Sequence, residues 1–169
     1  DWSSDVCSSD LLEIAAEEIG RLLNEGGDLT RARLWPINTR YVAAQGKAFA
    51  GQLATLIGAM STTAEENDFF FRHDVIFSDR TFASLSRGEP LVFSATELLR
   101  MAAVMLGGVL TRKVRVSTIR SLLRGMQNGA QAEQLYTNYP ENEADFDDWV
   151  RRADQFWKKC GSMAENAIR

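Results

Sequence analysis

One stretch of the chain is rich in basic side chains and has no acid to balance them, because no acidic residue lies between Glu97 and Glu133. Within it, Arg120 and Arg124 are one turn apart on a predicted helix and therefore share a face. Arginine forks bind phosphate and carboxylate groups bidentately, and Ser117 would set a helix N-terminus beside them. The candidate residues for binding a nucleic acid or an acidic partner are Arg112, Lys113, Arg115, Ser117, Arg120 and Arg124.

Three explanations of this basic region stay open at the level of sequence. Acidic residues are dense from Glu141 to Asp148, so the basic side chains can pair with carboxylates of the same chain. A phosphate backbone is the second explanation, and an acidic protein partner is the third.

The segment VRVSTIRSLLRGM, residues 114–126, resembles the recognition helix of helix-turn-helix proteins. The resemblance covers under a tenth of the chain and is carried by Val116, Ser117, Thr118, Ile119 and Leu123. It implies a helix that contacts DNA. The segment departs from that pattern, because two residues are missing after Ser117 and Arg115 stands where the turn glycine belongs. We therefore assign no family from it.

A second basic cluster surrounds two aromatic residues, Trp35 and Tyr41. Aromatic side chains interleaved with arginines can stack on unpaired bases, which favours a nucleic-acid contact here too. The alternative is that Trp35, which precedes Pro36, anchors a loop on the body of the protein. The residues of this cluster are Arg31, Arg33, Trp35, Arg40 and Lys47.

Residue types that perform catalysis are sparse. The single histidine, His73, cannot build a multi-histidine metal site, and the adjacent Asp74 would point in another direction on a helix. Cys160 falls on an apolar stripe, where a buried thiol behaves as a small hydrophobe. We expect that the protein is not an enzyme and that it has no catalytic residue, metal or cofactor. The enzymatic alternative would use Glu65, Asp68, His73 or Asp74 between helices.

The elements that position these residues follow a helical period almost throughout the chain. Two predicted helix starts carry the pattern of a capping box, in which a serine or threonine stands three residues before a glutamate. The capping residue is Thr62 or Thr63 at the first start and Ser94 at the second. Pro36 predicts a boundary before a long helix over residues 38–60. We expect residues 112–116 to be extended, Ser117 to cap the next helix, and the last helix to run from Asn142 to a stop at Gly161.

Within the long helix, small residues recur every four positions and let another helix approach closely. They form a ridge of Gly46, Ala50, Ala54 and Gly58. The large apolar residues of the same helix are Val42, Phe49, Leu53, Leu56, Ile57 and Met60. The ridge predicts either an internal helix–helix contact or a seam for self-association.

The first eleven residues, DWSSDVCSSDL, have no helical or strand period. Over all eleven letters they resemble the translation of a sequencing-library adapter in one reading frame. The resemblance implies a disordered segment foreign to the protein, with the native N-terminus missing. Setting Cys7 aside leaves Cys160 alone, so we expect no internal disulfide and a reducing, cytoplasmic setting.

The chain has 169 residues, of which 45% are hydrophobic and 25% charged, with a net charge of −4. Its longest apolar run, Met101–Leu110, is too short to span a bilayer, and we expect no membrane partner. The sequence predicts an all-α, single-domain bundle of five to seven helices over residues 12–169. We expect a non-enzymatic helical subunit that works by association with a protein partner or with its own copies. The alternative is a nucleic-acid-binding subunit that uses the Arg112–Arg124 face.

Overall fold

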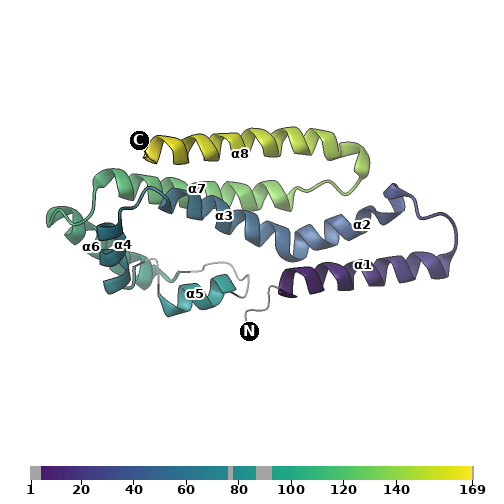
Figure 1. Ribbon diagram of the computed structural model, residues 1–169, viewed down its shortest axis with the longest axis horizontal. Helices are drawn as coiled ribbons and strands as arrows, with labels where there is room; N and C mark the ends of the chain where they lie inside the picture. The colour runs from purple at the N-terminus through teal and green to yellow at the C-terminus, as the bar shows by residue number, and fades with distance from the viewer. Residues whose placement is uncertain (1–4, 76–77, 87–92, 169) are drawn as a thin grey trace.

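The computed structural model describes residues 5–75, 78–86 and 93–168, and these residues form helices and short connections without any strand (Figure 1). Counted with α2, η1 and α3 as one continuous rod, the described helices number seven, so the predicted all-α bundle is confirmed. The elements are α1 (Asp5–Glu25), α2 (Arg31–Tyr41), the π-helical turn η1 (Val42–Gly46), α3 (Lys47–Ala59), α4 (Ala64–Arg72), α5 (Asp79–Ser86), α6 (Ala95–Leu110), α7 (Val116–Thr137), the 3₁₀ turn η2 (Glu143–Asp145) and α8 (Phe146–Ile168).

Helix α1 begins at Asp5, inside the segment for which the sequence predicted no helix. Once a helix is nucleated, each added residue extends it at little cost, so a segment without its own period can continue it. Residues 5–11 are therefore helical in the structure.

The rod formed by α2, η1 and α3 begins at Arg31 and contains Pro36, so the boundary predicted at Pro36 is wrong. Thr30 caps the rod, because its side chain accepts a hydrogen bond from the Arg33 backbone N–H at 3.4 Å. Trp35 is buried, and its Nε1 donates to the carbonyl of Pro140 at 2.9 Å. This long-range contact holds the segment helical despite the amide hydrogen that proline lacks.

Helices α3 and α7 lie side by side at the centre of the molecule, with their backbones almost in contact (Figure 1). A Cβ added to Gly58 would lie 2.6 Å from the Cα of Gly125, and one added to Gly125 would lie 2.7 Å from the Thr55 carbonyl oxygen. The predicted ridge thus makes the internal contact, with Ala50 and Ala54 also buried. A second copy cannot reach this ridge while α7 covers it.

Gly46 is the exception in that ridge. A Cβ at Gly46 would meet only Val42 of its own turn, and Gly51 is the glycine that lies against α7, packed on the side chain of Glu133. The π-helical turn supplies the reason, because a turn with an extra residue rotates the face that α3 presents relative to α2.

Helix α8 packs along α3 and α7, with Phe156 and Trp157 against Ala50, Ala54 and Ala132. It starts at Phe146, after η2, and continues through Gly161 to Ile168, so both predicted ends differ from the observed ones. Packing against α3 and α7 holds the turns of α8 that precede Gly161. A single glycine costs only about 1 kcal/mol in a helix, which is too little to end the helix there.

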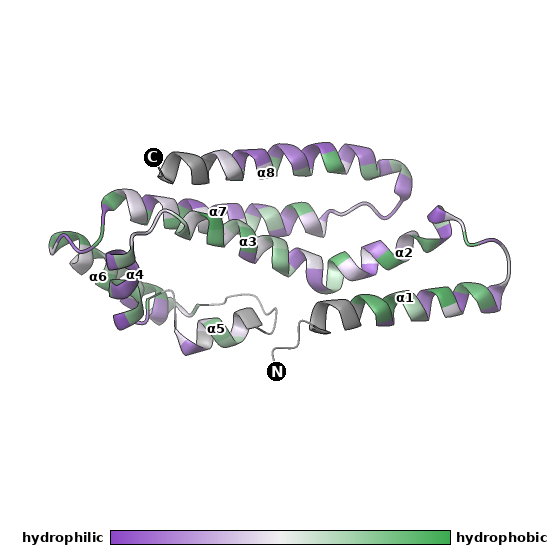
Figure 2. Cartoon of the chain, viewed as in Figure 1, coloured by the Kyte–Doolittle hydropathy of each residue, from purple (hydrophilic) through white to green (hydrophobic). Residues whose placement is uncertain are grey.

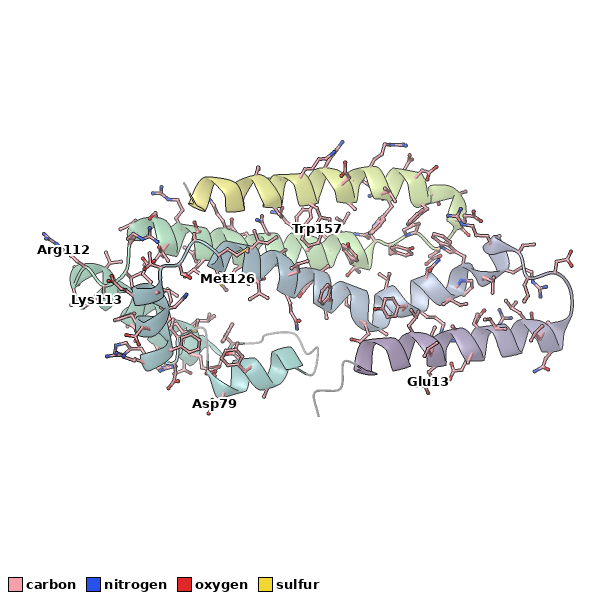
Figure 3. All side chains as sticks on the ribbon, in the orientation of Figure 1. Glu13, Asp79, Arg112, Lys113, Met126 and Trp157 are labelled. Carbon is pink, nitrogen blue, oxygen red and sulfur yellow. The ribbon has the colours of Figure 1, made fainter. Side chains whose placement is uncertain are left out.

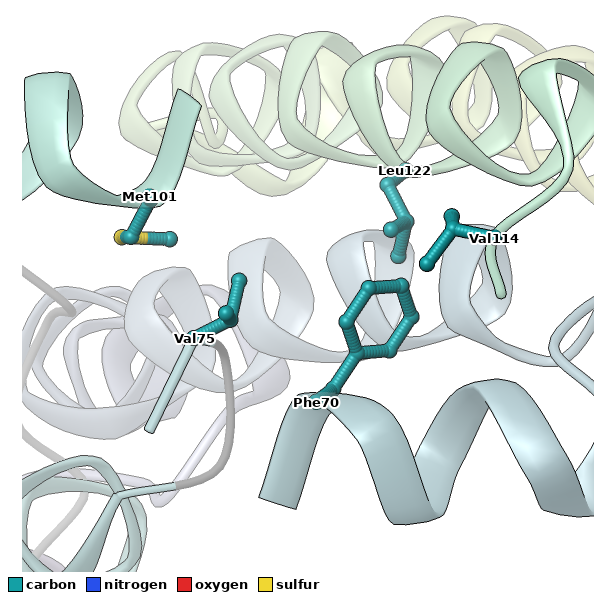
Figure 4. Packing of buried hydrophobic residues seen from close by; sticks show 5 residues of the cluster. All are labelled: Phe70, Val75, Met101, Val114 and Leu122. Atoms are coloured by element: carbon teal, nitrogen blue, oxygen red, sulfur yellow. The ribbon is translucent and has the colours of Figure 1, made fainter. Parts of the chain in front are cut away.

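A second core lies where α4 and α6 meet the start of α7 (Figure 4). The two predicted capping boxes are confirmed at the starts of α4 and α6, with Thr63–Glu66 and Ser94–Glu97 as the pairs. The sequence also predicts a break at Ser78-Asp79, a short helix to Ser86 and a loop at Glu89-Pro90. Helix α5 confirms the short helix, whereas the loop, like Ile76 and Phe77, lies outside the described residues. The buried members of this core are Phe70, Val75, Met101, Val114 and Leu122. Of the described helices, none combines the length and apolarity needed to cross a membrane.

Candidate interaction surfaces

The connection between α6 and α7 is a tight turn, so the prediction of an extended segment at residues 112–116 is wrong. The amide of Arg112 donates to the Val109 carbonyl at 3.0 Å and that of Lys113 to the Gly108 carbonyl at 2.8 Å. These two bonds define a Schellman motif. Arg112 occupies its left-handed position, at φ 58°, where glycine is the usual residue.

A buried carboxylate fixes the start of α7 to α4. Glu66 accepts hydrogen bonds from the backbone N–H of Arg115 at 2.8 Å, from its Nε at 3.0 Å and from its Nη2 at 2.8 Å. The hydroxyl of Thr118 donates to the same carboxylate at 2.8 Å. Arg115 also donates to the carbonyl of Ser61. Arg115 is therefore a structural residue, which removes it from the predicted binding face.

This arrangement also occupies the N-terminus of α7. Arg115, not Ser117, is the N-cap residue, so the predicted cap is wrong, and the anion at that helix end is the Glu66 carboxylate. Burial raises the pKa of Glu66, but the hydrogen bonds from Arg115, Thr63 and Thr118 outweigh burial and bring the pKa down to about 2. Glu66 is thus ionised under ordinary conditions.

The remaining cations of the basic region stay exposed. Arg112, Lys113, Arg120 and Arg124 form no ion pair within the part of the chain that the structure describes. Arg112 and Lys113 lie at one end of the molecule's long axis (Figure 3). The acidic run 141–148 lies at the other end of α7, so it does not neutralise them.

The three arginines of the second basic cluster form ion pairs within the chain. Arg33 pairs with Glu25 of α1 at 3.5 Å, and Arg40 pairs with Glu17 and Glu18. Arg31 pairs with Glu143 at 3.0 Å and lies over the ring of Trp35.

The indole of Trp35 is equally unavailable to a base. It is 3% exposed, and it stacks on Tyr139 and meets the edge of Phe146. The cluster therefore docks α2 onto α1 and the start of α8, and only Lys47 of its members is an exposed cation without an ion pair among the described residues.

Two helices present apolar stripes to solvent, which the sequence did not reveal as surfaces. On α3 the large residues Phe49, Leu53, Leu56 and Met60 are 64%, 40%, 43% and 62% exposed. Hydrophobic residues recur along this helix (Figure 2). The four exposed residues follow the spacing i, i+4, i+7 and i+11, on the side away from the buried ridge. The same spacing recurs on α6 in Leu99, Ala103, Leu106 and Leu110, all exposed.

The groups considered for catalysis do not converge. His73 is exposed at the end of α4 with its ring against Phe69, and Asp68 pairs with Arg72 at 2.9 Å. Cys160 is fully buried, and burial raises the pKa of its thiol. Among the described residues, no three of His, Cys, Asp and Glu lie close enough to hold a metal ion.

Comparison with protein-family models, with curated proteins and with solved structures gives no match.

Proposed function

We propose that this protein is a non-enzymatic helical subunit that works by binding another protein surface through the outward stripe of α3. The observation that carries the proposal is the exposure of Phe49, Leu53, Leu56 and Met60 along one face of one helix. Single exposed apolar residues are normal on proteins, whereas a contiguous apolar stripe indicates an interaction site.

The stripe has the form that a helical partner recognises. Anchors at i, i+4, i+7 and i+11 match the helix-in-groove mode, in which an amphipathic helix lays its apolar face on a partner. The helix that presents them is rigid, because α7 holds its other face through backbone contacts at Gly58 and Gly125. A preorganised face loses little entropy on binding.

The test is site-specific photo-crosslinking from the stripe. A photoreactive residue at Phe49 is expected to give one discrete adduct, either with a copy of this chain or with another protein. The matched control places the same group at Leu12 of α1, which is 67% exposed against 64% for Phe49. Absence of a discrete adduct at Phe49, or the same adducts from Leu12, would refute the proposal.

A double substitution measures how much the stripe contributes to the affinity for the partner. Phe49 and Met60 are 64% and 62% exposed, so most of each side chain is free to be buried by a partner. For F49S/M60S we therefore expect a loss of at least about 2 kcal/mol, or roughly thirtyfold in affinity. The control L12S/L23S removes residues of similar exposure, 67% and 62%, and should leave the affinity unchanged.

A further inference from the structure

The outer face of α7 carries a polar and cationic row that the fold does not use. The buried positions of α7 face α3 and include Thr118, Leu122 and Gly129. On the opposite side, exposed side chains continue from the α6–α7 turn along more than three turns of helix. Their members are Arg112, Lys113, Ser117, Arg120, Arg124, Gln127 and Gln131.

This row concentrates positive charge on one face of a chain that is otherwise strongly acidic. The net charge is −4, so setting apart the four positive charges of Arg112, Lys113, Arg120 and Arg124 leaves −8 on the rest of the chain. No acidic residue interrupts the row, since none occurs between Glu97 and Glu133. Such a charge distribution orients the basic face toward a polyanion and speeds the encounter.

The backbone beneath the row is fixed in a way that keeps its cations outward. The Glu66–Arg115 contacts anchor the start of α7 to α4. Arg112 holds a left-handed conformation that is unfavourable for a residue with a side chain, and such outliers cluster at functional positions. A glycine there would satisfy the turn but would remove one cation from the end of the row.

We propose that this row binds the sugar–phosphate backbone of a nucleic-acid duplex. Arginine, lysine, serine and glutamine side chains are the groups that contact phosphate and sugar. From Arg120 to Gln131 the row spans about 16 Å of helix, over which one duplex strand presents about five phosphates. A duplex is favoured over a single strand because no aromatic side chain belongs to this row and Trp35 is buried.

The row and the α3 stripe share no residue, so this proposal stands or falls independently of the proposed function. The test uses the full chain and a fluorescein-labelled DNA duplex of arbitrary sequence, with binding followed by anisotropy across a salt series. Four phosphate contacts predict a slope of log affinity against log salt of about −3.6. R120Q/R124Q is expected to halve that slope and to weaken binding at low salt at least tenfold.

The matched control is R72Q/K158Q, which removes the same charge from two exposed cations that already pair with Asp68 and Asp154. It should bind the duplex like the wild type, and circular dichroism of both variants checks that the fold is retained. Undetectable binding at low salt, or equal losses in the two variants, would overturn the proposal. Stronger binding to phosphatidylserine vesicles or to polyglutamate than to the duplex would also overturn it and would assign the row to a membrane or to an acidic protein.

Discussion

Glu66→Gln is the substitution that tests most directly how α4 and α7 are held together. The carboxylate accepts hydrogen bonds from the Thr63 backbone, the Thr118 hydroxyl and three donors of Arg115. Glutamine keeps the size of the side chain but loses its charge. It also turns an amide donor toward a group of donors, so at least one hydrogen bond is lost.

The size of the effect follows from the pKa. Lowering the pKa of Glu66 from 4.5 to about 2 corresponds to roughly 3 kcal/mol of preferential stabilisation of the ionised form in the folded protein. The side chain of Arg115 is 52% exposed, and solvent screens its interaction with the carboxylate. We therefore expect E66Q to lower the free energy of unfolding by about 2 kcal/mol at neutral pH.

The same reasoning fixes the pH dependence. The carboxyl group has a lower pKa in the folded state than in the unfolded state, so its contribution is complete above about pH 5 and is lost as the pH falls toward 2. At about pH 3 less than half of it remains. The stability difference between the wild type and E66Q should therefore shrink on acidification.

The assay is urea unfolding followed by far-ultraviolet circular dichroism, at neutral pH and at about pH 3. Glu65→Gln is the control, because Glu65 is the exposed neighbour in the same first turn of α4. A difference between wild type and E66Q that is equal at both pH values would refute the electrostatic explanation. Equal stabilities of E66Q and E65Q at neutral pH would refute the structural role of Glu66.

Two further predictions concern backbone positions and use the same unfolding measurement. Gly58→Ala should destabilise the protein by about 1–3 kcal/mol, because the new methyl group meets the backbone of α7, whereas Gly107→Ala, with nothing within 4 Å, should stabilise it by about 0.5–1 kcal/mol. Arg112→Gly should stabilise it by about 1 kcal/mol by relieving the left-handed conformation, and a loss of stability instead would show that the arginine side chain makes a needed contact.

The parts of the fold that the sequence predicts well are encoded over three or four residues. Thr63 with Glu66 and Ser94 with Glu97 marked two helix starts, because a capping box is a local arrangement of side chain and backbone. Each of these signals can be read without knowing what the helix packs against.

The predictions that failed have a different cause. In each of them, the contact that decides the structure joins residues that lie far apart in the sequence. Pro36 stays inside a helix since Trp35 donates to Pro140, which is 105 residues away. Arg115 leaves the basic face since it binds Glu66, 49 residues away. The second basic cluster is neutralised by glutamates of α1 and η2. A charge pattern shows which residues can pair but not which of them meet.

Helix α3 shows why that distinction bears on function. A helix of its size can bury either its small-residue ridge or its large apolar stripe against a single neighbour, because the two lie on different sides. Against α7 it buries the ridge, where Gly58 meets Gly125 and the close backbones gain dispersion and packing contacts over their length. Phe49 and Met60 are then left outside by geometry and not by a lack of hydrophobicity. Helices α7 and α8 cover the small-residue side of α3, and large apolar residues kept on the remaining face are what a further contact outside the chain requires.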